Sequence, residues 1–184
     1  DETALRLARA NAARAENAAF GDRVTVVAID LLGRAKAREA VLGRESAAHV
    51  ICNPPFFATA EVRASPAAGR AAAHVLAAGG LDAWVRVAAA TLEPRGRLAL
   101  IFKGDGLAEI LAALDGRFGA TAIRPIHPRA ETPAHRLVVT AIKGSRARPR
   151  LMPGLILHPP EGNAYLDAAE AILRGRAAFS DGSA

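Results

Sequence analysis

The segment Asn53-Pro54-Pro55-Phe56-Phe57 follows the short apolar run His49-Val50-Ile51-Cys52, so it stands where a buried strand is expected to end. Two consecutive prolines fix φ and donate no backbone hydrogen, which holds the chain extended after the strand. The Asn53 carboxamide oxygen and the Pro54 carbonyl can together accept both hydrogens of an exocyclic amine, and Phe56 offers a flat face for a base. The segment predicts an amine-binding site. The alternative is a plain turn, which Asn and Pro also favour.

The residues around this segment alternate between strand and helix patterns. The β-branched run before Asp30 and the apolar run 97–102 predict strands, while the polar stretch that ends at Gly43 predicts a helix. This order indicates a parallel α/β fold, and 121–126 with 136–143 reads as an antiparallel pair. We predict helices over 3–19, 32–44, 82–92, 107–114 and 164–174, and strands over 23–29, 49–52, 97–102, 121–126, 136–143 and 155–158.

Length and composition fit one globular domain. The chain has 184 residues, of which 51% are hydrophobic, which is enough for a core. It contains no apolar run long enough to cross a membrane and no signal-like start, so we expect a cytoplasmic location and no membrane partner. The single cysteine, Cys52, excludes an internal disulfide and is expected to be a small buried side chain without a role.

The charge favours polyanionic partners. The formal net charge is +6 and the sequence pI is about 10.6, and nucleic acid is the natural ligand for such a surplus. Arginine is scattered through an alanine-rich chain, a pattern that biased genome composition also produces. The cluster Arg146, Arg148 and Arg150 therefore carries more weight than the total.

Asn53-Pro54-Pro55-Phe56 resembles the Asn-Pro-Pro-(Phe/Tyr) motif of class I S-adenosylmethionine-dependent methyltransferases that modify amino nitrogens. Three further segments make the chain, from residue 1 to 174, most similar to the bacterial tRNA(Val) adenine-N6-methyltransferase family. They are Pro133-Ala134-His135-Arg136-Leu137-Val138-Val139, Lys143-Gly144-Ser145-Arg146, and Gly154-Leu155-Ile156-Leu157-His158 followed by Asn163-Ala164-Tyr165.

The resemblance implies a Rossmann-like α/β sheet, mostly parallel with an antiparallel C-terminal strand, and S-adenosyl-L-methionine as cofactor. It implies no metal and no covalent nucleophile, because positioning and electrostatics activate the amine. The implied catalytic residues are Asn53, Pro54, Pro55 and Phe56. Asp30, Leu31 and Asn53 are the implied cofactor contacts, although Asp30 is also a common helix cap.

The resemblance and the basic charge together predict RNA, with tRNA as the expected partner. Residues 58–80 form either a lid over the target base or a surface connection. The residues expected to contact substrate or RNA are Phe57, Arg63, Arg70, Arg129, His135, Arg136, Arg146, Arg148 and Arg150.

The glycine-rich cofactor loop and the first two strands of the resembled fold have no counterpart in the sequence. In that fold these strands lie between the 23–29 and 49–52 strands, a gap of roughly 10 Å. We expect an upstream segment or a neighbouring copy to complete the sheet, unless the sheet rearranges, and we expect the chain alone to bind the cofactor poorly. The domain is expected to span 1–184, with a core over 1–143 and a basic turn and tail over 144–184.

Three classes of function remain open from the sequence. The leading one is methylation of the exocyclic amine of adenine in RNA. The same chemistry on guanine of ribosomal RNA, adenine of DNA or a protein glutamine is the alternative among enzymes. A non-catalytic nucleic-acid-binding fragment is the third, because the glycine loop is missing.

Overall fold

The computed structural model describes residues 2–55, 57–58, 75–76 and 80–179. The chain forms two compact units, Asp1–Gly43 and Arg44–Ala184. None of the helices in the described part of the chain is long and apolar enough to span a membrane.

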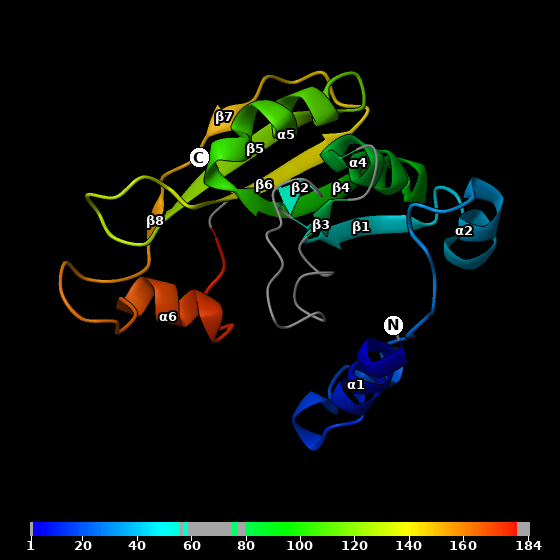
Figure 1. Cartoon of the computed structure of the whole chain (residues 1–184), viewed down its shortest axis with the longest axis horizontal. Helices are drawn as coiled ribbons and strands as arrows, with labels where there is room; N and C mark the ends of the chain where they lie inside the picture. The colour runs from blue at the N-terminus through cyan, green and yellow to red at the C-terminus, as the bar shows by residue number, and fades with distance from the viewer. Residues whose placement is uncertain (1, 56, 59–74, 77–79, 180–184) are drawn as a thin grey trace. The chain divides into compact units, whose positions relative to one another are not determined.

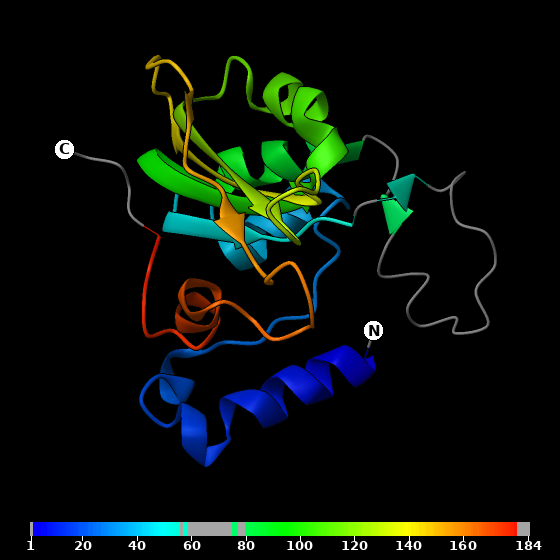
Figure 2. The same ribbon diagram turned by 90° about the vertical axis from the view of Figure 1, so that its left-hand side faces the viewer.

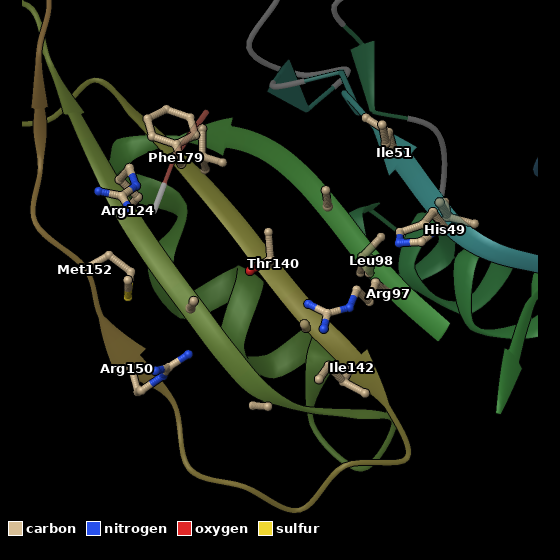
Figure 3. A pocket seen from close by; sticks show the side chains of 16 residues that line it. His49, Ile51, Arg97, Leu98, Arg124, Thr140, Ile142, Arg150, Met152 and Phe179 are labelled. Carbon is tan, nitrogen blue, oxygen red and sulfur yellow. The ribbon is translucent and has the colours of Figure 1, made fainter. Parts of the chain in front are cut away.

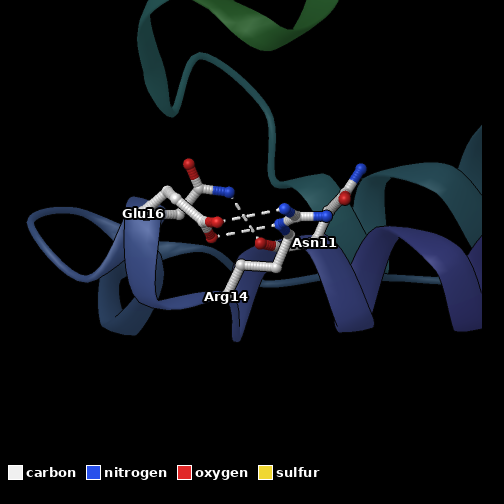
Figure 4. A network of polar contacts seen from close by, with 4 residues as sticks. Asn11, Arg14 and Glu16 are labelled. Carbon is white, nitrogen blue, oxygen red and sulfur yellow. Dashed lines mark hydrogen bonds and ion pairs between the residues drawn. The ribbon is translucent and has the colours of Figure 1, made fainter.

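The first unit consists of short helices. Helix α1 (Glu2–Ala12) is shorter than predicted, and two 3-10 helices (Ala15–Asn17 and Gly21–Arg23) follow it. Figure 4 shows the contacts at the end of α1: the Arg14 guanidinium donates to both carboxylate oxygens of Glu16 at 3.2 and 3.1 Å, and Asn17 Nδ2 donates to the carbonyl oxygen of Asn11 at 2.7 Å. The carbonyl of Asn11, which also accepts from the Arg14 backbone amide at 3.2 Å, thus receives a second hydrogen bond at the end of the helix.

The strand predicted over 23–29 is not formed, and this prediction is wrong. Residues 24–30 have no regular secondary structure, although Val24 has an extended backbone (φ −94°, ψ 119°). A β-branched run favours an extended chain, but a strand also needs a hydrogen-bonding neighbour. No described strand pairs with this segment. Helix α2 (Ala35–Leu42) then ends before Gly43 (φ 75°), as predicted.

The second unit contains a six-stranded sheet in the order β1-β4-β6-β5-β7, with β8 also paired to β5. β1 is parallel to β4, β7 and β8 are parallel to β5, and β6 is antiparallel to both β4 and β5. Within the described sheet, β6 is thus the one strand that runs against the others. The strands are β1 (Ala47–Cys52), β4 (Leu92–Lys103), β5 (Phe118–His127), β6 (Arg136–Lys143), β7 (Arg150–Leu151) and β8 (Leu155–Ile156).

This arrangement confirms the predicted fold class, a mixed α/β sheet of mostly parallel strands with one antiparallel C-terminal strand. β2 (Phe57–Ala58) and β3 (Val75–Leu76) form a separate parallel pair. In the described residues β1 pairs with β4 alone. The expectation that further strands lie beyond β1 stays a prediction.

Helices α4 (Gly80–Thr91) and α5 (Leu107–Leu114) cover one face of the sheet, as Figures 1 and 2 show from two directions. Alternate residues of each strand point to this face. Trp84 packs against the core, as predicted. The core side chains are Leu81, Val85, Ala88 and Leu92; Leu98, Leu100 and Phe102; Ile110, Ala113 and Leu114; and Phe118, Ile123, Leu137, Val139 and Ala141.

Two details differ from the expected helix boundaries. The sequence predicts a helix from residue 82, but α4 begins at Gly80, and Asp82 forms ion pairs with Arg86 at 3.0 Å and Arg117 at 2.9 Å. The last helix, α6 (Asp167–Leu173), begins three residues later than predicted.

β4 begins before the predicted strand 97–102, and residues 93–96 form an irregularity within it. Ala47 lies opposite Leu92 and His49 opposite Arg97, so extra residues of β4 bulge between these two pairs. Arg95 adopts a positive φ of 70° there. The bulge lets β1 resume a regular register over its last residues.

Lys143 joins three segments at the start of β1. Its ammonium donates to the carbonyl of Leu92 at 2.6 Å and to the carboxylate of Glu45 at 2.9 Å. The hydrogen bond and charge of Lys143 lower the pKa of Glu45. The end of β6 is thereby tied to the beginning of β4 and to the residues before β1.

Gly104 allows the chain to turn closely after β4. Its amide donates to the carbonyl of His135 at 3.0 Å, and a Cβ on Gly104 would lie 1.9 Å from the carbonyl oxygen of Ala134. Only glycine fits so near another backbone. The 103–106 stretch is thus a closely packed turn.

Cys52 is the last residue of β1 and packs against the core. Burial raises the pKa of its thiol to about 11. The side chain therefore packs as a small apolar group, as the sequence predicted, but it is half-buried rather than fully buried.

We predict that Gly104→Ala destabilises the protein by about 1 to 3 kcal/mol, because the new methyl group forces two backbone segments apart. Urea unfolding measures the loss. Gly144→Ala is the matched control: nothing lies within 4 Å of its Cβ position, and its positive φ of 69° costs about 1 kcal/mol. Equal losses in the two variants would contradict the close approach at Gly104.

We also predict that Cys52 reacts slowly with iodoacetamide at pH 8. A thiol pKa raised from 9.0 to about 11 leaves roughly 100-fold less thiolate than in the unfolded chain. Mass spectrometry of the native and urea-unfolded protein compares the two rates. Similar rates in both states would show that the thiol is not buried.

Candidate active site

The Asn53-Pro54-Pro55 segment begins where β1 ends, at the carboxyl end of the strand. The prolines cannot donate to a ladder, so pairing stops there. Pro54 is fully buried, Asn53 is exposed and Pro55 is half-buried. No peptide bond in the described residues is cis. The buried Pro54 ring anchors the segment while the Asn53 side chain faces outward.

Two hydrogen-bond acceptors at this position have no partner among the described residues. No described group donates to Asn53 Oδ1 or to the carbonyl oxygen of Pro54. Within the described ranges both acceptors are open, and an amino group has two hydrogens to donate. Phe56, the expected stacking partner, lies outside the described residues.

Asp30 lies in the first unit and lines a hollow with the apolar residues Ala4, Leu5, Ala8, Val27, Ala28 and Ile29. Its Oδ1 accepts from the amide of Leu32 at 3.1 Å, which makes a local turn. The carbonyl of Leu31 accepts from Arg38 at 3.1 Å. Apolar walls with one carboxylate fit the adenine ring of a cofactor and its amine. Asn53 belongs to the second unit.

Arg129 makes contacts within the chain. Its guanidinium donates to the carbonyls of Pro159 and Gly162, the latter at 2.8 Å, and reaches Oδ1 of Asn163 at 3.5 Å. It therefore holds the turn before α6. Sequence reasoning assigned it to RNA and did not foresee this contact, because the partners lie about thirty residues away.

His135 and Arg136 lie at the start of β6. The imidazole of His135 is exposed, and its pKa is lowered, first by desolvation and then by the charge of Arg136. The neutral form is therefore favoured at pH 7. Arg136 donates to the carbonyl of His135 at 2.9 Å.

The remaining predicted RNA contacts fall into two groups. Arg146, Arg148 and Arg150 are exposed in and next to the loop between β6 and β7. Phe57 lies in β2. Arg63, Arg70 and most of the expected lid over 58–80 lie outside the described residues.

Sequence reasoning missed a group of side chains on the sheet face opposite α4 and α5. They line a hollow and include Arg97, Arg124 and Thr140. The signal was present in β4, where Leu98, Leu100 and Phe102 are buried and the residues between them must face the other way.

The part of the chain that the structure describes contains no group of three His, Cys, Asp or Glu side chains arranged to hold a metal ion.

Comparison with known proteins gives matches among solved structures. No family model matches the sequence, and no curated protein matches it. Among solved structures, the chain is similar to the crystal structure of a predicted O-methyltransferase from Agrobacterium tumefaciens. The two share 37% sequence identity with a TM-score of 0.77, over 97% of this chain and 76% of that chain.

An identity of this size over most of both chains shows common descent as well as a common sheet. The α/β sheet with its antiparallel β6 is consistent with that relationship. The chain therefore belongs to the same methyltransferase family as the Agrobacterium protein.

Proposed function

We propose that this methyltransferase transfers a methyl group from S-adenosylmethionine to the exocyclic amine of adenine in RNA, with tRNA as the substrate class. The observation that carries the proposal is the pair of open acceptors, Asn53 Oδ1 and the Pro54 carbonyl. Two acceptors fixed at the end of a strand match the two hydrogens of an amino group and orient its lone pair outward.

Different residues of the chain bind the amine and the cofactor. Asn53 and Pro54 hold the amine, draw electron density toward its nitrogen and fix the direction of attack. Asp30 and the apolar hollow around it receive the adenine ring of the cofactor, with the carboxylate accepting from its amine. S-adenosylmethionine, when bound, supplies an electrophilic methyl group. The amine loses a proton after transfer, so no buried base is required beforehand.

The RNA part of the proposal is supported by charge. The chain has a net charge of +6, and Arg146 and Arg148 are exposed in a loop where a phosphate backbone can reach them. A base is most easily unstacked in a single-stranded loop, which favours tRNA over duplex DNA.

Methyl transfer to a hydroxyl is the second candidate, because the Agrobacterium relative is named a predicted O-methyltransferase. A hydroxyl has one hydrogen, so it leaves one of the two acceptors unpaired. It also requires removal of its proton before or during attack. The twin acceptors therefore favour an amine.

We predict that Asn53→Ala lowers kcat for RNA methylation about 100-fold or more, as the loss of a positioned hydrogen-bond partner does. The affinity for S-adenosylhomocysteine should stay within about twofold, because the acceptor acts on the amine. Nucleoside mass spectrometry identifies N6-methyladenosine, and calorimetry measures the affinity. Asn53→Asp, which keeps an oxygen acceptor, should retain more activity than Asn53→Ala.

Two outcomes would contradict this assignment. Asn53→Ala could keep more than about a tenth of the activity, which is too much for a group that fixes the amine. The wild-type product could instead carry its methyl group on oxygen, in which case the hydroxyl candidate is correct.

We further predict that the double variant Arg146→Ala and Arg148→Ala flattens the salt dependence of tRNA binding. Each lost phosphate contact reduces the slope of log K against log[salt] by about 0.7 on a single strand. Filter binding at several salt concentrations measures the slope. The double variant Arg174→Ala and Arg176→Ala is the control, because it removes the same charge from another part of the chain. Identical salt slopes for the two double variants would show that the loop does not contact RNA.

A further inference from the structure

A hollow of about 500 Å³ crosses the sheet face that α4 and α5 leave open. Figure 3 shows most of its lining side chains on the strands β1, β4, β6, β5 and β7, with Met152 and Phe179 outside the strands. Small-molecule sites commonly measure about 300 to 1,000 Å³. The size of the hollow is thus that of a ligand site. It lies wholly within the second unit.

The floor of the hollow is one row of paired residues. Ile51 lies opposite Ala99, Ala99 opposite Thr140, Thr140 opposite Ala122, and Ala122 opposite Arg150. Directly paired residues point to the same face of a sheet. Three small side chains therefore sit in the middle of the row and form a flat, mostly apolar surface.

Two neighbouring rows form the walls. On one side His49 pairs with Arg97 and Arg97 with Ile142; on the other, Val138 pairs with Arg124. Each row lies two residues from the floor, or about 7 Å along the strand. An arginine thus stands on either wall, and Arg150 stands at one end of the floor.

The lining is basic and contains no acid. Arg97, Arg124, Arg150 and His49 line the hollow, and none of the described lining residues is Asp or Glu. An anion placed on the floor meets guanidinium groups from several directions. Arginine binds phosphate through paired donors, so this arrangement favours a phosphate group.

Arg124 is fixed in position. It donates to the carbonyl of Pro153 at 2.6 Å, and its guanidinium carbon lies 4.7 Å from the ring centre of Phe179. These contacts restrict the motion of its side chain, which reduces the entropy that a ligand must overcome. Figure 3 shows Phe179 and Arg124 together at one end of the hollow.

We infer that the hollow binds a nucleoside phosphate. The ring system lies on the flat floor of Ala99, Thr140 and Ala122, and the phosphate lies at the wall that Arg97 and His49 form. The flat apolar floor, the arginines of the lining and the lack of Asp and Glu among its described residues fit this class of ligand. The site goes beyond the proposed function, because it is distinct from the amine acceptors at Asn53 and requires no methyl transfer.

The nucleoside phosphate can come from a free nucleotide or from one unit of an RNA strand. The test is a calorimetric titration of the protein with adenosine 5′-monophosphate, with inorganic phosphate and with an oligoribonucleotide of adenosine. It measures the affinity for each ligand. We expect the monophosphate to bind more tightly than inorganic phosphate. Tighter binding of the oligonucleotide identifies RNA as the source, and equal or weaker binding identifies a free nucleotide.

Arg97→Gln tests the wall. This variant should lower the affinity for adenosine 5′-monophosphate about tenfold or more, since a charge-assisted hydrogen bond is lost. Arg95→Gln removes the same charge from the same strand outside the hollow and should change the affinity less than about twofold. Thr140→Leu, which raises the floor at an exposed position, should also weaken binding, and circular dichroism confirms that each variant is folded.

Three results would overturn the inference: no detectable binding of the monophosphate, equal binding of inorganic phosphate, or equal losses in Arg97→Gln and Arg95→Gln. Asn53→Ala separates this site from the methyl-transfer proposal. It should leave monophosphate binding unchanged, so that either proposal can fail while the other stands.

Discussion

The pairing of β4 with β1 on one side and β6 on the other is the constraint on which the second unit depends. Leu98, Leu100 and Phe102 are buried under α4 and α5, which fixes the face and the register of β4. β1 follows that register, so its end is fixed in place. The position of Asn53 is thus a consequence of hydrophobic packing several residues away.

Local sequence patterns predicted a strand correctly where the sheet supplies a partner strand. The apolar run before Asn53 and the alternating residues of 136–143 each became a strand, because each finds a partner in the described sheet. The β-branched run 23–29 carried an equally clear pattern and formed none, since no described strand lies beside it. Propensity predicts extension, and pairing decides the strand.

The candidate site was predictable only in part for the same reason. Asn53 and Pro54 act through their own backbone and side chain, so a short motif was enough to find them. The hollow on the open face depends on which residue of β4 lies opposite which residue of β6 and β5. The contacts of Lys143 and Arg129 likewise join residues far apart in sequence. Such cross-strand and long-range relations are not encoded in any single segment.

The alternation along β4 also has an evolutionary consequence. One set of its side chains is buried in the core, while Arg97 and Ala99, which alternate with that set, line the hollow on the opposite face. Mutations in the second set can change what the surface recognises at little expense in folding free energy. Descendants of this chain can therefore acquire new ligands by exchanging every other residue of one strand, while the strand itself remains under purifying selection.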